Sequence, residues 1–305
     1  MVSVIINNYN YGQFLKEAID SALNQTYSNI EVIVVDDGST DNSREIIAAY
    51  EERIIPVLQN NGGQASALNA GFAASKGGLI CLLDSDDTWL ESKVNVIVEA
   101  AKKNPEAVLI YHRLQRIDAN GILWGKPHPS YLYKGWINTK VMHSGGHWRF
   151  APTSCLCFQR ALLERVMDIP EEEFRICADS YLADITPFLG PVIGIEEPLT
   201  LYKLHHKNNW FREDLNQDKE LFLKNIQFCE IRVRVLNQTL ERLGMVERVS
   251  LNDHLTYQYF KRRVGQGKSI LKLSLLALRC PVEPSLSIRL KTVVKLWLME
   301  LGVIR

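Results

Sequence analysis

Residues 79–87 read Leu-Ile-Cys-Leu-Leu-Asp-Ser-Asp-Asp, an apolar run typical of a buried strand that leads into an acidic turn. Two earlier stretches repeat this arrangement. The β-branched run 2–6 leads into Asn-Asn-Tyr-Asn at 7–10, and the run 31–35 leads into Asp-Asp-Gly-Ser at 36–39. Polar clusters therefore follow three of the predicted strands directly.

Amphipathic stretches separate these strands, at 14–23, 40–50 and 65–75, and a further short strand is predicted at 54–58. Thr40 or Asp41 can cap the second of these helices. Strands that alternate with helices predict an α/β, doubly wound sheet whose strands are parallel in this part of the chain. Because ligands bind such sheets beyond the carboxyl ends of the strands, we expect the three polar clusters to converge on one crevice.

Three carboxylates lie within four residues at the last of these strand ends, on Asp84, Asp86 and Asp87. Carboxylates this close repel one another unless a cation neutralises them. Oxygen ligands suit Mg²⁺ or Mn²⁺, which commonly share their coordination shell with substrate phosphates. The alternative is a solvated acidic turn that caps the next helix. The preceding apolar strand and the following Trp89 favour a metal site.

Four stretches together resemble the family 2 glycosyltransferases, which have the GT-A fold. They are Ser-Val-Ile-Ile-Asn-Asn-Tyr-Asn at 3–10, Val-Val-Asp-Asp-Gly-Ser-Thr-Asp at 34–41, Asn-Gly-Gly-Gln-Ala-Ser-Ala-Leu-Asn-Ala-Gly at 61–71 and Leu-Asp-Ser-Asp-Asp at 83–87. The resemblance implies a Rossmann-like, doubly wound mixed sheet with a C-terminal helical extension. It also implies an inverting transfer of a hexosyl-type sugar from a nucleotide diphosphate, usually UDP, with Mn²⁺ or Mg²⁺ as cofactor.

The resemblance also implies roles for residues at the strand ends. Asn7 and Tyr9 would contact the base, on which Tyr9 could stack, and Asp37 would accept a hydrogen bond from the base. Asp84 would face the ribose, and Asp86 would bind the metal. An ordinary turn tyrosine is the alternative for Tyr9.

The family's catalytic base is an aspartate in the second half of the domain, and the resemblance places it at Asp179. An inverting transfer needs a carboxylate that takes the proton of the acceptor hydroxyl as its oxygen attacks the anomeric carbon. Ala178 stands where the family usually has glutamate. Asp184 is the fallback base, and a helix-capping role is the alternative for Asp179.

The segment Tyr-Lys-Leu-His at 202–205 resembles a late segment of many family members, and it implies that His205 contacts the metal or the diphosphate. A neutral imidazole can ligate Mn²⁺, and an imidazolium can pair with phosphate. His206 could take this part instead, and a surface histidine is the alternative for both.

We expect three regions along the chain. Residues 1–105 would form the nucleotide-sugar-binding half of the GT-A domain, residues 106–212 the acceptor-binding and catalytic half, and residues 213–305 a basic, helical extension with a first helix at 216–243. Residues 254–305 hold ten Lys and Arg against two Glu. Basic amphipathic helices can lie on an anionic membrane. Packing on the catalytic domain or on a second subunit is the alternative.

Composition limits the cellular setting. The formal net charge is zero, which argues against a general nucleic-acid binder. The sequence passes from Met1 straight into a strand without a signal peptide, and no apolar run approaches the roughly 20 residues of a membrane span. The six cysteines form no C-x-x-C pair, which favours buried, reduced thiols. We therefore expect a cytoplasmic protein, with peripheral contact at the inner face of the membrane through 254–305 left open.

The leading hypothesis is a metal-dependent transferase that moves a single sugar from a UDP-linked donor to a glycan or lipid-linked acceptor in cell-surface polysaccharide synthesis. The Q-x-x-R-W motif of processive synthases is absent, which favours single addition. Two alternatives stay open. A catalytically weak nucleotide-sugar-binding scaffold is compatible with Leu68, where many members have arginine, and with Ala178. A nucleotidyltransferase would need a Gly-rich phosphate loop that is not found after the first strand. The oligomeric state is left open.

Overall fold

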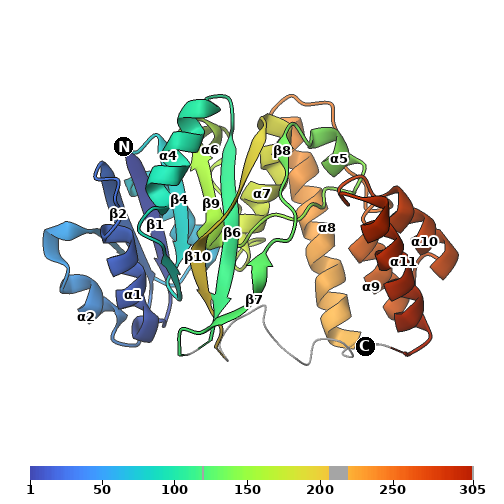
Figure 1. Ribbon diagram of the computed structural model, residues 1–305, viewed down its shortest axis with the longest axis horizontal. Helices are drawn as coiled ribbons and strands as arrows, with labels where there is room; N and C mark the ends of the chain where they lie inside the picture. The colour runs from blue at the N-terminus through green and yellow to red at the C-terminus, as the bar shows by residue number, and fades with distance from the viewer. Residues whose placement is uncertain (119, 206–218, 304–305) are drawn as a thin grey trace. The chain divides into compact units, whose positions relative to one another are not determined.

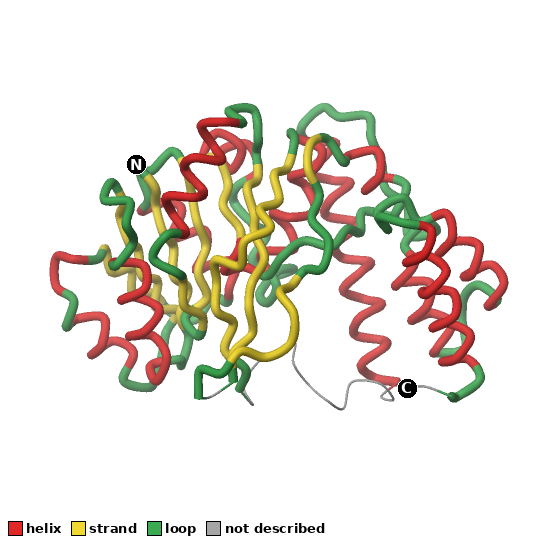
Figure 2. The backbone as a smooth tube through the Cα atoms, viewed as in Figure 1, coloured by secondary structure: helices red, strands yellow, loops and turns green. Residues whose placement is uncertain are grey.

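The computed structural model describes residues 1–118, 120–205 and 219–303 (Figures 1 and 2). The chain divides into two compact units, each described here by itself. The sheet unit comprises residues 1–136 and 150–205. The helical unit comprises residues 137–149 and 206–305, of which 206–218, 304 and 305 lie outside the described residues.

The described part of the sheet unit contains a ten-stranded mixed sheet. Its strands are β1 (Val2–Asn8), β2 (Ile30–Asp37), β3 (Ile55–Gln59), β4 (Leu79–Asp84), β5 (Asp87–Trp89), β6 (Leu109–Ile117), β7 (Leu123–His128), β8 (Lys134–Gly135), β9 (Leu156–Gln159) and β10 (Val192–Lys203). The order is β3-β2-β1-β4-β9-β6-β10-β5, with β7 beside β6 and β8 beside β10. The helices of this unit are α1 (Gly12–Leu23), α2 (Ser43–Ala48), η1 (Glu51–Arg53), α3 (Gln64–Ala74), α4 (Lys93–Lys103), η2 (Thr153–Cys155), α6 (Arg160–Val166) and α7 (Ala178–Leu189).

The first four strands are parallel, as the alternation of strands and helices predicts. Alternate side chains of a strand point to opposite faces, and β1 uses both faces. Val4 and Ile6 belong to one apolar cluster with α1 and α4, which lie on the same side of the sheet in Figure 1. Ile5 points the other way, toward Gly71 of α3. Both faces of the strand are thus covered by apolar packing, and its polar residues lie at the carboxyl end.

The sheet becomes mixed at β9, which runs antiparallel to both β4 and β6. This confirms the mixed sheet that the family resemblance implies. β9 begins two residues after Ser154 of η2, so the path into this strand brings Ser154 beside the carboxyl end of β4. One sheet therefore spans the boundary expected near residue 105, and the functional division there stays a prediction.

Gly71 sets how closely α3 approaches the sheet. A Cβ at this position would lie 2.5 Å from Cγ2 of Ile5 and 3.1 Å from Cγ2 of Val35. Both neighbours are β-branched strand residues, which have little rotamer freedom to move away.

We therefore expect Gly71→Val to lower the free energy of unfolding by about 1–3 kcal/mol, because it overpacks a filled core. Chemical denaturation measures this. Gly78→Ala is the control, since a Cβ there meets no atom within 4 Å. Equal stabilities of the two variants would contradict the close packing of α3.

The helical unit contains α5 (Asn138–Met142), α8 (Lys219–Arg242), α9 (Leu255–Arg263), α10 (Ile270–Arg279) and α11 (Leu286–Glu300) in its described part. Ile226 and Cys229 of α8 pack with Tyr257 of α9. A second cluster joins Leu273 and Ala277 of α10 to Leu296 of α11, with other partly buried residues around it. None of the described helices has the length and apolarity to cross a bilayer.

Two buried histidines lie together in the helical unit. The ring centroids of His147 and His254 are 5.2 Å apart. Burial, and then the positive charges of Arg232 and Arg149, lowers the pKa of His147 to about 3. Burial, and then His147 and Arg232, lowers the pKa of His254 well below its usual range. Glu283 pairs with Arg149 at 2.7 Å, so it offsets that arginine's charge.

Both histidines are therefore neutral in the folded protein near pH 7, whereas in the unfolded chain they gain protons below about pH 6.5. Because the unfolded state binds more protons, stability falls as pH falls through that value, by on the order of 2 kcal/mol per histidine between about pH 7 and pH 5. Denaturant unfolding followed by helical circular dichroism across this range measures the effect. His147→Gln should flatten the profile. An unchanged slope in that variant would contradict the assignment.

Candidate active site

The polar residues predicted at the strand ends lie side by side at the carboxyl edge of the sheet. Asn7 of β1 is in register with Val35 of β2 on one side and with Asp84 of β4 on the other. Asn8 is in register with Asp36. The structure thus brings together the three clusters that the sequence places on separate strands.

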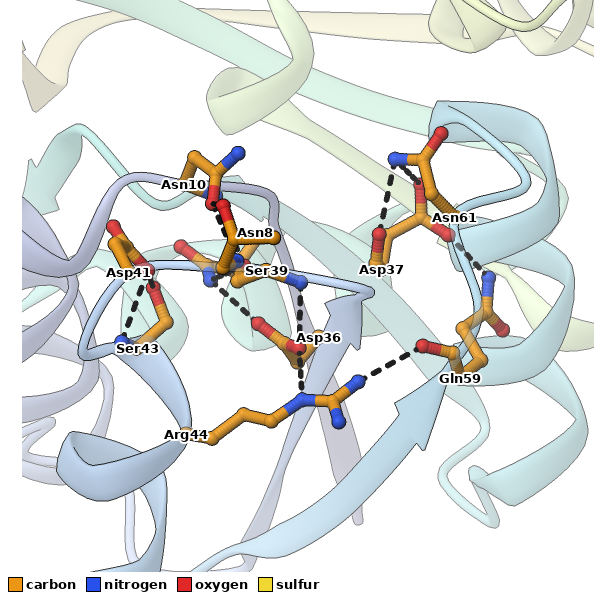
Figure 3. A network of polar contacts seen from close by, with 11 residues as sticks. Asn8, Asn10, Asp36, Asp37, Ser39, Asp41, Ser43, Arg44, Gln59 and Asn61 are labelled. Carbon is orange, nitrogen blue, oxygen red and sulfur yellow. Dashed lines mark hydrogen bonds and ion pairs between the residues drawn. The ribbon is translucent and has the colours of Figure 1, made fainter.

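Asp36 anchors the first two strand ends to each other (Figure 3). Its side chain is fully buried and accepts hydrogen bonds from the Arg44 guanidinium at 2.8 Å and from the Asn8 amide at 3.0 Å. Asn8 also donates to the Ser39 hydroxyl. Although burial opposes ionisation, these donors keep the pKa of Asp36 below its usual value. The carboxylate is therefore a structural anchor for the turn that follows β2.

Asp37 holds the loop after β3. One carboxylate oxygen accepts from the Gln59 amide at 2.6 Å and the Gly62 N–H at 2.8 Å, and the other accepts from the Gly63 N–H at 2.7 Å and the Asn61 amide at 3.0 Å. Figure 3 shows Gln59 and Asn61 turned toward this carboxylate. Four donors match the capacity of a carboxylate. Its predicted hydrogen bond to a base stays a prediction, and would require one of these donors to be exchanged.

Asp84 and Asp86 share a crowded acidic environment with Asp179. Burial, and then the charges of Asp86 and Asp179, raises the pKa of Asp84 to about 7, against hydrogen bonds from Asn7 and Thr153. Asp179 thus lies close enough to Asp84 to influence its charge, although 95 residues separate them in the sequence. Four of the predicted site residues therefore lie close together: Asn7, Asp84, Asp86 and Asp179.

His205 lies against Asp86. Its Nε2 atom is 3.0 Å from a carboxylate oxygen of Asp86, and both side chains are largely buried. The His205 ring stacks on Phe14, with centroids 4.5 Å apart, and meets the edge of Tyr11 at 5.9 Å. Burial, and then Asp86 and Asp84, raises the pKa of Tyr11 to about 12. Asp86 and His205, the two residues predicted to act at a metal, therefore lie together, and the His205 imidazole stacks on the Phe14 ring.

Ser154 connects the acidic turn to the rest of the fold. Its hydroxyl donates to the buried Asp87 carboxylate at 2.6 Å and accepts from the Asp84 N–H at 3.0 Å. Its carbonyl oxygen accepts from Trp89 Nε1 at 3.0 Å, Lys93 Nζ at 2.7 Å and Thr200 Oγ1 at 3.0 Å. One fully buried serine thus fixes both ends of the turn that carries Asp86.

Lys93 is a buried cation beside this turn. Its ammonium lies 3.2 Å from the centroid of the Trp89 ring, and burial lowers its pKa to about 8 against the attraction of three cysteines and Asp87. Burial, and then Asp86 and Asp84, raises the pKa of Asp87 well above its usual range. The lysine therefore supplies positive charge to a region that is rich in acidic groups.

Asp179 occupies the first turn of α7, where the helix dipole favours a negative charge. Thr153 Oγ1 donates to its carboxylate at 3.2 Å. The first residue of α3 fixes the start of this helix, because Gln64 Oε1 accepts from the Ala178 N–H at 2.9 Å and the Gln64 N–H donates to the Arg175 carbonyl at 2.8 Å. The loop after β3 and the start of α3 thus contact both Asp37 and the helix that carries the predicted base.

The remaining predicted residues differ in exposure. Tyr9 lies beyond the end of β1 with 47% of its surface exposed, which leaves its ring accessible. Asp184, the fallback base, is only 4% exposed within α7. His206 lies outside the described residues. Sequence reasoning assigned no role to five residues that contact this site: Tyr11, Gln64, Thr153, Ser154 and Arg175. Their positions depend on contacts between distant segments, for which one sequence carries no local signal.

Asp84, Asp86 and His205 are residue types that can ligate a divalent cation. Among the described residues, however, no group of three or more His, Cys, Asp or Glu is arranged so that it could hold a metal ion by itself. Mg²⁺ is commonly held by one or two carboxylates together with phosphate oxygens. The raised pKa of Asp84 and the contact of His205 with Asp86 mark a place where a cation would relieve crowded negative charge.

The fold thus gathers acidic side chains at the carboxyl ends of its parallel strands, which is where α/β proteins bind their ligands. The sequence pattern of the family described as Glycosyl transferase family 2 matches residues 3–167. The chain belongs to this family and is a glycosyltransferase.

Relatives cover nearly the whole chain. A glycosyltransferase of Nostoc sp. is 36% identical over 92% of this chain and 89% of its own length. The glycosyltransferase GlyG of Streptococcus pneumoniae is 34% identical over 88% of this chain and 99% of its own length.

Solved structures share the fold. TarS 1–349 of Staphylococcus aureus in complex with UDP-GlcNAc has a TM-score of 0.58 at 17% identity, over 98% of this chain and 92% of that one. The mannosyltransferase PcManGT of Pyrobaculum calidifontis in complex with GDP-Man and Mn²⁺ has a TM-score of 0.56 at 15% identity, over 99% of this chain and 79% of that one. These likenesses show that the chain has the GT-A fold.

We expect Ser154→Ala to lower the free energy of unfolding by about 1–3 kcal/mol, because the buried Asp87 carboxylate and the Asp84 N–H each lose a partner. Equilibrium denaturation measures this. Ser28→Ala, at an exposed position, is the control and should stay within about 0.5 kcal/mol of the parent. Equal effects of the two substitutions would show that Ser154 does not hold the turn.

Proposed function

We propose that this glycosyltransferase is an inverting, metal-dependent enzyme that transfers a single sugar from a nucleotide diphosphate, of the UDP-sugar type, to a glycan or lipid-linked acceptor in cell-surface polysaccharide synthesis. The observation that carries the proposal is the convergence of Asp84, Asp86 and Asp179, from two segments far apart in sequence, with His205 against Asp86. UDP-GlcNAc is bound by the structural neighbour TarS, and GDP-Man with Mn²⁺ by PcManGT, which supports a nucleotide-sugar donor here.

In this proposal Asn7 and Tyr9 bind the base, Asp37 accepts a hydrogen bond from it, and Asp84 faces the ribose. Asp86 and His205 would hold Mn²⁺ or Mg²⁺. A divalent cation bound there supplies positive charge that stabilises the leaving diphosphate. Phe14 keeps the imidazole of His205 in place by stacking, and Ser154 keeps the turn of Asp86 in place through Asp87 and the Asp84 backbone.

Asp179 acts as the general base. Its carboxylate takes the proton of the acceptor hydroxyl while that oxygen forms a bond to the anomeric carbon, and the bond from this carbon to the diphosphate breaks. Thr153 donates a hydrogen bond to the Asp179 carboxylate, which lies in the first turn of α7. Ala178 in place of the family's usual glutamate leaves Asp179 as the carboxylate at this helix start.

The proposal places the enzyme in the cytoplasm, with peripheral contact at the inner face of the membrane where a lipid-linked acceptor would be reached. The absence of a Q-x-x-R-W motif from the sequence supports single addition.

We expect metal-dependent release of UDP from one member of a panel of UDP-sugars. Asp86→Ala should abolish it with loss of the metal response. Asp179→Asn should lower the rate by about 10²–10⁴-fold while UDP binding is kept, because only proton removal is lost. Coupled UDP detection gives the rates and calorimetry gives the binding.

Glu99→Gln is the control, since this glutamate is exposed on α4 and pairs only with Lys102 in the described structure. Full activity of Asp179→Asn would transfer the base role to Asp184, to be tested in the same way. UDP binding without turnover of any donor, with or without added acceptor glycans, would favour a binding scaffold. A protein that binds no nucleotide diphosphate would overturn the proposal.

A further inference from the structure

Helix α11 presents an apolar stripe to solvent. Leu286, Leu290, Val294, Trp297 and Leu301 follow one another at intervals of four, four, three and four residues, which places them on one face of a helix. They are 63%, 49%, 57%, 37% and 69% exposed. The buried side of α11 is a different face, represented by Leu296 in the cluster with α10. The stripe is therefore additional to the surface that α11 buries in its own fold.

Helix α10 adds to the same surface. Its Leu271 and Leu275 are 65% and 52% exposed, whereas Leu273 and Ala277 are buried in the cluster with α11. Trp297 Nε1 donates to Ser274 Oγ at 3.1 Å, so the edge of the α11 stripe touches α10 next to Leu275. We call these exposed side chains the α10–α11 face: Leu271, Leu275, Leu286, Leu290, Val294, Trp297 and Leu301.

Basic residues border the α10–α11 face. Lys291 and Lys295 each follow a member of the stripe by one position, about 100° around the helix, and both are exposed. Lys272 and Arg279 are exposed in the same way on α10. The two acidic residues of 254–305 are already engaged, since Glu283 pairs with Arg149 and Glu300 accepts from Arg262 at 2.9 Å. The border of the face is therefore positively charged.

We infer that the α10–α11 face binds the surface of an anionic lipid bilayer. Leucine and valine side chains of an amphipathic helix enter the boundary between headgroups and acyl chains, tryptophan prefers that interface, and lysines beside them meet the anionic headgroups. The positive charge beside the apolar stripe distinguishes two possible partners of this face, a second copy of the chain and an anionic bilayer. A symmetric contact with a second copy would bring like-charged lysines together, whereas an anionic bilayer complements them.

This inference rests on the part of the proposed function that places the enzyme at a membrane, and it names the surface that makes the contact. It does not depend on the sugar donor or on the catalytic base. Membrane binding and sugar transfer can therefore fail separately.

The test is co-sedimentation of the full chain with phosphatidylcholine vesicles, with and without phosphatidylglycerol. We expect binding that requires phosphatidylglycerol and weakens with added salt. Lys291→Glu with Lys295→Glu should weaken it roughly tenfold or more, because each lysine near an anionic surface contributes about 1 kcal/mol. Leu290→Gln with Val294→Gln should reduce binding without changing the net charge.

Matched controls come from the sheet unit. Lys126→Glu with Lys134→Glu makes the same charge change at exposed positions, and Ile122→Gln with Leu123→Gln makes the same apolar change. Both controls should bind like the parent chain. Circular dichroism melting checks that each variant folds, and UDP release in the absence of vesicles checks the transferase separately.

Several outcomes would overturn the inference. These are a parent chain that ignores phosphatidylglycerol, binding that survives in both α10–α11 variants, or equal losses in the control variants. A dimer in light scattering that Leu290→Gln with Val294→Gln dissociates, in a chain that does not bind vesicles, would assign the face to a second copy.

Discussion

The hydrogen bonds of Ser154 are the constraint on which the acidic turn at residues 84–87 depends. Its hydroxyl joins the Asp87 side chain to the Asp84 backbone, and its carbonyl gathers three donors, including the buried ammonium of Lys93. A turn with three carboxylates would spread apart by repulsion unless its backbone were fixed from outside. Because β9 runs antiparallel between β4 and β6, it delivers Ser154 to that turn. The mixed sheet is thus what makes a compact acidic site possible.

The loop after β3 connects the strand end that carries Asp37 to the start of the helix that carries Asp179. The Asp37 carboxylate accepts from four donors in residues 59–63, and the side chain of Gln64, the first residue of α3, accepts from the Ala178 N–H at the start of α7. The position of Asp179 relative to the strand ends is therefore set by a chain of short contacts within the sheet unit. A change in this loop would therefore alter the surroundings of Asp37 and of Asp179 together.

The sequence predicts the parallel strands and their polar ends well, because strand period, turn residues and acidic clusters are local signals. Asn7 and Asp84, which belong to two of the polar clusters expected to converge, lie in register on neighbouring strands. The approach of His205 to Asp86 joins residues 119 positions apart and was reachable only through family resemblance. The role of Ser154 was not reachable, since it depends on the antiparallel insertion of β9. The prediction that Thr40 or Asp41 caps the second helix was wrong, since α2 begins at Ser43 with Asn42 as its N-cap residue. Asp41 instead accepts hydrogen bonds from the Gly12 and Ser43 N–H groups, and the first of these contacts joins distant segments.

Charge is unevenly divided along a chain whose formal net charge is zero. Asp84, Asp86 and Asp87 crowd negative charge into one turn of the sheet unit, and the buried Lys93 beside this turn supplies positive charge there. The excess of Lys and Arg lies in 254–305, away from these groups in sequence. This excess gives an anionic surface a single part of the chain to attract.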